Sequence, residues 1–102
     1  MAYNLRLIDA ADSDIREAIK YYEQVLLGLS LDFERCLEEA YSNILTMPLG
    51  YEVRFNDIRI TYIRRFPFAI HYVVDGNDIT VIAVFHQAIS PIKWLERKSK
   101  LG

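Results

Sequence analysis

Hydrophobic and polar residues are arranged along the chain with two different periods. Over residues 3–7 every second residue is apolar, which is the period of a half-buried strand. Over residues 11–26 and 33–45 the apolar residues recur at helical spacing, so each segment predicts an amphipathic helix. The short link between these helices predicts an antiparallel helical hairpin.

Residues that start and stop helices mark the boundaries of the hairpin. Asp9 and Asp12 would place negative charge in the first turn, where the helix dipole favours it. Gly28 can end the first helix in a left-handed conformation, and Ser30 can cap the second. The Pro48–Gly50 segment then ends the second helix.

In the second half of the chain the period changes to two residues. Alternating patterns over residues 58–62, 68–74 and 79–86 predict three further strands. The sequence Asp75-Gly-Asn-Asp78 lies between the last two patterns, and its residues tolerate positive φ. The last two strands are therefore expected to form a tight hairpin.

This hairpin fixes the expected partners of the two histidines. With Gly76-Asn77 as the loop, His71 should pair with Ile82, and His86 with Pro67. By parity both histidines would lie on one face of the sheet, too far apart to share a metal ion. Because no third ligand stands nearby in the pattern, no metal site is expected.

A short helix is expected at the end of the chain. Ser90 can cap residues 91–97, with Pro91 in the first turn. The element order is then β-α-α-β-β-β with a helical tail, in a single domain of residues 1–102. Since the helical hairpin has one apolar side, it should cover one face of an antiparallel sheet, which is an α+β fold.

Composition limits the classes of protein to be considered. The chain has 102 residues, and 52% of them are hydrophobic, which argues for one folded domain rather than disorder. No apolar run approaches the roughly 20 residues of a membrane span, and Arg6 and Asp9 interrupt the place of a signal peptide. The lone Cys36 fits a reducing compartment and a core position. A cytoplasmic protein without a membrane partner is expected.

Charge is divided unevenly along the chain. Residues 1–50 hold four Lys/Arg and nine Asp/Glu, a balance of −5, whereas residues 51–102 hold eight and five, a balance of +3. The basic half could present one surface to an acidic partner, or its charges could be ordinary solvated side chains. The cations in question are Arg59, Arg64, Arg65, Lys93, Arg97, Lys98 and Lys100.

The chain resembles the RelE/ParE toxins of bacterial type II toxin–antitoxin (plasmid stabilisation) modules. The resemblance rests on the element order, on the run RRFPFAIHY at residues 64–72, and on ITVIAVFH at residues 79–86. The tail from His86 to Arg97 is similar to the family pattern H-x-x-R-x-P-x-x-W. The resemblance implies a growth-inhibiting toxin that needs no cofactor. A cognate antitoxin would neutralise it, with a disordered segment that folds along the helical hairpin.

The resemblance also narrows the target. RelE-like members cut messenger RNA on the ribosome, whereas ParE-like members inhibit DNA gyrase and are not nucleases. RNA cleavage without a metal needs a base, an acid and cations for the phosphorane charge. The positions where nuclease members carry arginines match Ala69 and Ile89, so a ParE-like, non-enzymatic activity is favoured. A ribosome-dependent endoribonuclease using His86, Arg59 and Arg65 is the alternative. Many ParE-like members also carry arginine at the position of Ile89, so a degenerate, non-toxic antitoxin-binding module is a third possibility.

Several residues are candidates for contacting the target, although none is assigned a catalytic role. Two neighbouring tyrosines of the first helix have different expected roles. Tyr22 belongs to the apolar stripe of the helix, whereas Tyr21 is a candidate partner contact. Trp94 is expected to pack back on the sheet unless it binds the target. The target-binding candidates are Arg64, Arg65, His86, Ile89, Lys93, Trp94 and Arg97.

Overall fold

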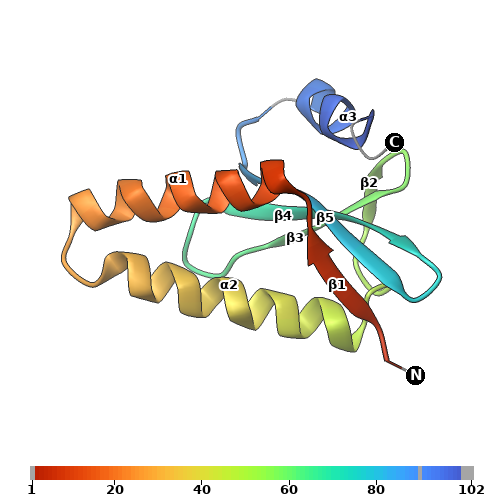
Figure 1. Ribbon diagram of the computed structural model, residues 1–102, viewed down its shortest axis with the longest axis horizontal. Coiled ribbons are helices and arrows are strands. Elements are labelled where there is room, and N and C mark those ends of the chain that lie inside the picture. The colour runs from red at the N-terminus through yellow and green to blue at the C-terminus, as the bar shows by residue number, and fades with distance from the viewer. Residues whose placement is uncertain (1, 90, 100–102) are drawn as a thin grey trace.

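The elements of the chain follow the order expected from the sequence, with one additional strand. The additional strand is β2, which has three residues, too few to show an alternating pattern. The computed structural model describes residues 2–89 and 91–99, and its elements are β1 (Asn4–Leu7), α1 (Asp9–Val25), α2 (Leu29–Thr46), β2 (Val53–Phe55), β3 (Ile58–Tyr62), β4 (Phe68–Asp75), β5 (Asp78–His86) and α3 (Pro91–Ser99) (Figure 1).

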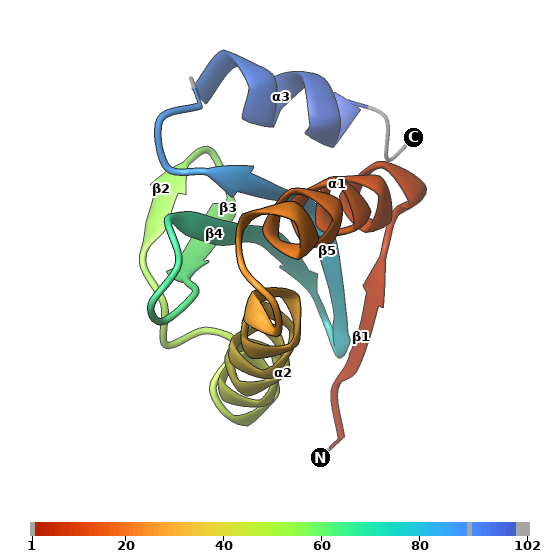
Figure 2. The same ribbon diagram turned by 90° about the vertical axis from the view of Figure 1, so that its left-hand side faces the viewer.

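The strands form one sheet that lies between two helical layers. The strand order is β1-β5-β4-β3-β2, and every pair is antiparallel except β1 with β5, which is parallel. Helices α1 and α2 cover one face of the sheet, and α3 covers the other (Figure 2). The predicted α+β fold is confirmed, although the parallel pairing of β1 was not predicted. None of the described helices is long and apolar enough to cross a membrane.

The helix boundaries confirm most of the signals in the sequence. Asp9 and Asp12 lie in the first turn of α1, where they interact favourably with the helix dipole. Gly28 adopts the left-handed conformation, with φ +83°, but it directly precedes α2. The cap predicted at Ser30 is wrong, because α2 begins at Leu29 and Ser30 is buried within its first turn. The cap predicted at Ser90 lies outside the described residues.

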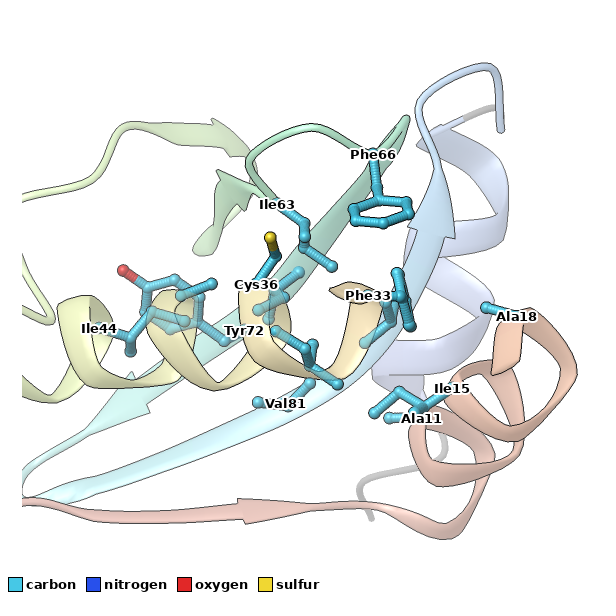
Figure 3. Packing of buried hydrophobic residues seen from close by; sticks show 14 of the residues in the cluster. Ala11, Ile15, Ala18, Phe33, Cys36, Ile44, Ile63, Phe66, Tyr72 and Val81 are labelled. Atoms are coloured by element: carbon cyan, nitrogen blue, oxygen red, sulfur yellow. The ribbon is translucent and has the colours of Figure 1, made fainter. Parts of the chain in front are cut away.

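The larger core fills the space between the helical hairpin and the sheet. Tyr22, Phe33 and Phe66 form an aromatic cluster with ring centroids 5.0 to 5.3 Å apart, part of which is visible in Figure 3. The core positions predicted for Tyr22 and Cys36 are confirmed. The buried residues of this core are Ala11, Ile15, Ala18, Tyr22, Phe33, Cys36, Leu37, Ala40, Ile44, Ile63, Phe66, Ile70, Tyr72, Ile79, Val81 and Val84.

A smaller core lies on the opposite face, under α3. Trp94 of α3 is buried there and stands edge-on to the His71 ring, with centroids 4.4 Å apart. The prediction that Trp94 packs back on the sheet is therefore confirmed. The buried apolar residues of this second core are Ile58, Ile60, Ile82, Ala83, Phe85 and Trp94.

A β-bulge in β5 shifts its pairing with β4. Next to the turn the register is the predicted one, with Tyr72 opposite Val81. One residue further on, His71 faces Ala83, so Ile82 is left without a partner. A bulge of this kind places two residues of one strand opposite one of the other, and here Ile82 and Ala83 both join the core under α3.

The bulge places the two histidines on opposite faces of the sheet. His86 pairs with Phe68, not with Pro67 as predicted, and its ring lies 5.7 Å from the Phe68 ring on the side of the helical hairpin. His71 packs against Trp94 on the other side, and its predicted pairing was displaced by one residue. The prediction that both histidines share one face is therefore wrong.

An ion pair between α1 and α3 holds the bulge. Arg97 donates two hydrogen bonds of 2.8 Å to the carboxylate of Asp14, and a third of 3.1 Å to the carbonyl oxygen of Ile82. The backbone N–H of Val84 donates to the same carboxylate over 3.0 Å. The pair thus supplies partners for two backbone groups of β5 beside the bulge, at a point that β1 does not reach.

Candidate functional site

A recess lies on the α3 side of the sheet, at the end of β5. Its volume is about 220 Å³, and strands β2 to β5, the segment after β5 and α3 all contribute to its walls. This α3-side recess is lined by Arg54, Ile60, Tyr62, Ala69, His71, His86, Gln87, Ile89 and Trp94.

His71 is the most deeply buried polar residue of this recess. Its Nδ1–H donates to the carbonyl oxygen of Ala69 over 3.1 Å. Burial lowers the pKa of His71 to about 4, so the ring is neutral near pH 7. Its Nε2 and the indole N–H of Trp94 have no hydrogen-bond partner among the described residues. A base this weak is poorly matched to proton abstraction at neutral pH.

The two positions at which nuclease relatives would carry arginine both line the α3-side recess. Ala69 is buried, and Ile89 is half-buried against the core under α3. Arg54 is the permanent cation among the described lining residues, and its Nη1 donates to the hydroxyl of Tyr62 over 3.4 Å. The recess therefore has one arginine, whereas stabilising a phosphorane calls for several convergent cations.

A second recess lies on the other side of the same strand end, against α1. Its volume is about 300 Å³, and it continues into a neighbouring hollow of about 390 Å³ that shares Tyr21, Phe68 and His86. His86 is exposed between the two recesses, and its Nδ1 accepts a hydrogen bond from the N–H of Ala88. This α1-side recess is lined by Asp14, Glu17, Ala18, Tyr21, Phe68, Val84, Phe85, His86 and Ile89.

Arg64 and Arg65, two of the target-binding candidates, lie in the β3–β4 loop against α2. Arg64 makes two hydrogen bonds to Glu39, of 2.9 and 3.1 Å, and this hydrogen bonding lowers the pKa of Glu39. Arg65 lies 3.8 Å from Asp32. Both arginines are more than half exposed, so these surface pairs leave them accessible to a partner.

The remaining cations are distributed over other parts of the molecule. Arg59 donates to the carbonyl oxygens of Leu49 and Tyr51, and so fixes the segment after α2. Lys93 pairs with Glu96 within α3. Within residues 2–89 and 91–99 the single basic surface considered from the sequence is not formed, because α3 and the β3–β4 loop with its arginines lie on opposite faces of the sheet (Figure 2). Lys98 pairs with Asp57, and Lys100 lies outside the described residues.

Two of the target-binding candidates have structural partners inside the molecule. Arg97 is bound to Asp14, and its side chain is 19% exposed. Trp94 is buried under α3. Contact of either residue with a target remains a prediction, whereas Lys93 and His86 are exposed and available to one.

The tip of the helical hairpin carries exposed apolar side chains. Leu27 is 98% exposed, and Val25, Leu26 and Leu31 are each more than half exposed. Tyr21, the candidate partner contact, lies on α1 and is 62% exposed. Apolar side chains gathered in this way commonly mark a site of protein–protein contact.

Sequence reasoning missed several residues of these sites, among them Arg54, Tyr62, Asp14 and Glu17. Arg54 and Tyr62 line the α3-side recess, but the short strand of Arg54 gave no periodic signal. Asp14 looked like an ordinary exposed acid of an amphipathic helix, because its partner Arg97 is 83 positions away. Among the described residues no three His, Cys, Asp or Glu side chains come together as a metal site requires.

Comparison with known families identifies the fold. A sequence model described as the ParE toxin of type II toxin–antitoxin systems, parDE, matches residues 5–91. This chain belongs to the ParE toxin family. It is therefore of the toxin type of a type II toxin–antitoxin module, within the wider RelE/ParE group that the sequence resembles. No curated protein sequence matches it significantly.

Solved structures of toxin–antitoxin proteins share this ParE-family fold. The chromosomal ParDE system of P. aeruginosa gives a TM-score of 0.70 at 19% identity, covering 83% of this chain and 96% of the other. The RelBE2 toxin–antitoxin complex of Mycobacterium tuberculosis gives 0.57 at 20% identity, with coverages of 84% and 99%. An arginine-to-alanine double mutant of E. coli RelE in the free state gives 0.61 at 18%, covering 100% of both chains. The RelE/ParE fold predicted from the sequence is thereby confirmed.

Proposed function

We propose that this protein is a toxin that inhibits DNA gyrase and is neutralised by a cognate antitoxin. Membership of the ParE family supports the toxin role. The observation that carries the choice of target is the composition of the α3-side recess, where Ala69 lies at a position that the resemblance matches to an arginine of nuclease members. Ile89 lowers the positive charge of the recess further, although many ParE-like members carry arginine there too. A recess with one permanent cation is a poor stabiliser of the charge that develops during RNA cleavage.

His71 adds a second argument against RNA cleavage. Its pKa of about 4 keeps the buried ring neutral, and its Nδ1–H is bonded to Ala69. The remaining histidine, His86, lies on the opposite face of the sheet beside Phe68. Both side chains line the α3-side recess, but a ring as weakly basic as His71, already hydrogen-bonded to Ala69, is a poor partner for His86 in acid–base catalysis around one scissile phosphate.

The helical hairpin supports the antitoxin as the protein partner. Its tip exposes Leu26, Leu27 and Leu31 to solvent, which is unfavourable for a monomer with no partner. An antitoxin segment that folds on binding would cover these side chains with its own apolar residues. The hairpin carries a surplus of acidic residues, so basic residues on the antitoxin would assist association.

Growth and nucleic-acid readouts together test this proposal. The protein is induced in a bacterial host with and without the small protein encoded beside it. Growth arrest that co-expression relieves, with relaxed plasmid DNA and unchanged messenger RNA 5′ ends by primer extension, is the expected result. New 5′ ends that disappear in an Arg54→Ala/His86→Ala variant would instead establish the ribonuclease alternative. Unimpaired growth at high expression would establish the degenerate module.

A further inference from the structure

The α1-side recess combines aromatic rings with carboxylates of α1. Asp14 and Glu17 are three positions apart on α1, so their side chains lie on one face of the helix, and both line the recess. Opposite them stand Phe68 and His86, whose rings are 5.7 Å apart between centroids. Tyr21, one turn further along α1, lines both the recess and the hollow that continues it.

The first of these carboxylates already binds an arginine of the chain itself. Asp14 receives two hydrogen bonds from Arg97, whose guanidinium also lies 4.8 Å from the centroid of the Phe85 ring. A carboxylate of α1 and a ring of the sheet together hold this planar cation. One turn along the helix, Glu17 and the rings of Phe68 and Tyr21 repeat the same combination of groups.

Glu17 has no such partner among the described residues. Its carboxylate is not paired with any Lys, Arg or His of residues 2–89 and 91–99, although its negative charge acts on Arg97 from a distance. Asp14 is fully engaged by Arg97 and the N–H of Val84, so Glu17 supplies the charge at the open part of the recess. Helices α1 and α2 carry a net negative charge, which further favours a cation over an anion.

We infer that the α1-side recess receives an arginine side chain of the antitoxin. The aliphatic part of the side chain would lie between Tyr21 and Phe68, and its guanidinium would pair with Glu17. Arginine fits better than lysine because a planar guanidinium stacks on aromatic rings and bonds a carboxylate with two N–H groups. The antitoxin as the source of this arginine rests on the proposed function. The ability of the recess to bind an arginine side chain does not.

A small probe tests the recess without the antitoxin. N-acetyl-arginine N-methylamide is titrated into the ¹⁵N-labelled protein, and amide shifts are followed by NMR. We expect saturable shifts at Ala18, Tyr21 and His86 with an affinity on the order of millimolar, and binding roughly fivefold weaker in Glu17→Gln. Glu23→Gln, an exposed acid further along the same helix, is the matched control and should bind as the wild type does. A second probe has neutral citrulline in place of arginine. It should bind the wild-type protein as weakly as the arginine probe binds Glu17→Gln.

The antitoxin then identifies the source of the side chain. Glu17→Gln should weaken the complex roughly tenfold and reduce its salt dependence, whereas Glu23→Gln should leave both unchanged. Equal binding of the arginine and citrulline probes would refute the claim that the recess binds arginine through Glu17. Probe binding that is unchanged in Glu17→Gln would refute it as well. Equal affinity of wild type and Glu17→Gln for the antitoxin overturns its role as the source. If the antitoxin does not bind the wild type, the proposed function fails, and the probe alone decides the recess.

Discussion

Asp14 and Arg97 lie 83 positions apart in the sequence, yet their side chains form a two-pronged ion pair with both N–O distances at 2.8 Å. The pair joins α1 to α3 across the edge of the sheet, and it is largely buried. Asp14 also accepts a hydrogen bond from the N–H of Val84, and Arg97 donates one to the carbonyl oxygen of Ile82. One interaction therefore fixes the bulge of β5, the place of α3 and one side of each recess.

Removing one member of this pair should destabilise the fold. Arg97→Ala leaves the Asp14 carboxylate and the Ile82 carbonyl without their partner, so we expect a loss of about 3 kcal/mol in the free energy of unfolding. Lys98→Ala, on the same helix but in a more exposed pair with Asp57, should cost less than about 1 kcal/mol. Urea denaturation at pH 7 measures both. Equal stability of the two variants would show that the ion pair does not hold α3.

The stability of the protein should depend on His71 at mildly acidic pH. The pKa of His71 is about 4 in the folded protein and about 6.5 when unfolded, so between these values only the unfolded chain binds the proton. Stability should therefore fall as pH decreases from 6.5 to 4, by up to about 3 kcal/mol from this residue. Denaturation curves across this range should show a smaller slope for His71→Gln than for the wild type. A His71→Gln slope equal to that of the wild type would refute the assignment.

Binding of the antitoxin should depend on the tip of the helical hairpin. Leu27→Ser/Leu31→Ser removes two exposed apolar side chains, so we expect at least roughly tenfold weaker binding with folding almost unchanged. Leu45→Ser/Met47→Ser, at the other end of α2, is the control pair with similar chemistry. Isothermal titration calorimetry gives the affinities, and circular dichroism checks the fold. Equal losses in both pairs would mean that the tip has no special role.

Ile89 should be a position at which toxicity can be increased. If the arginine of other family members contacts an acidic target, Ile89→Arg restores a charge-assisted contact worth roughly 1.5–3 kcal/mol, or about ten- to a hundredfold in affinity. Ile89 is half-buried between the two recesses, so we expect a modest cost in stability, on the order of 1 kcal/mol, with antitoxin binding retained. Colony survival after induction at matched protein levels measures the effect. Equal survival would show that Ile89 is not a lost contact.

Local patterns in the sequence predict the elements of this fold well, because each pattern reports which side of an element is buried. The period of α1 and α2, the Asp75–Asp78 turn and the core position of Trp94 all follow from residues close in sequence. The bulge does not, since Ile82 continues an apolar run with no break in composition. The side chains that bond the backbone beside it, Asp14 and Arg97, meet only after the chain has folded.

The candidate site was predicted less completely for the same reason. Parity counting placed His71 and His86 on one face, and a single inserted residue at Ile82 moved them to opposite faces. The two recesses combine side chains from as many as five elements, so Arg54 and Glu17 carried no signal as isolated residues. The positions of Ala69 and Ile89 were informative because the family resemblance supplied the residues expected there.

The proposed target is tested most directly by a supercoiling assay with purified components. Relaxed plasmid, ATP and gyrase are incubated with increasing amounts of this protein, alone or saturated with its antitoxin, and the topoisomers are separated by electrophoresis. We predict that the free protein inhibits supercoiling at micromolar or lower concentration and that the antitoxin restores supercoiling. Full supercoiling at a large excess of folded protein, together with cleavage of messenger RNA on translating ribosomes by the same preparation, would contradict gyrase inhibition.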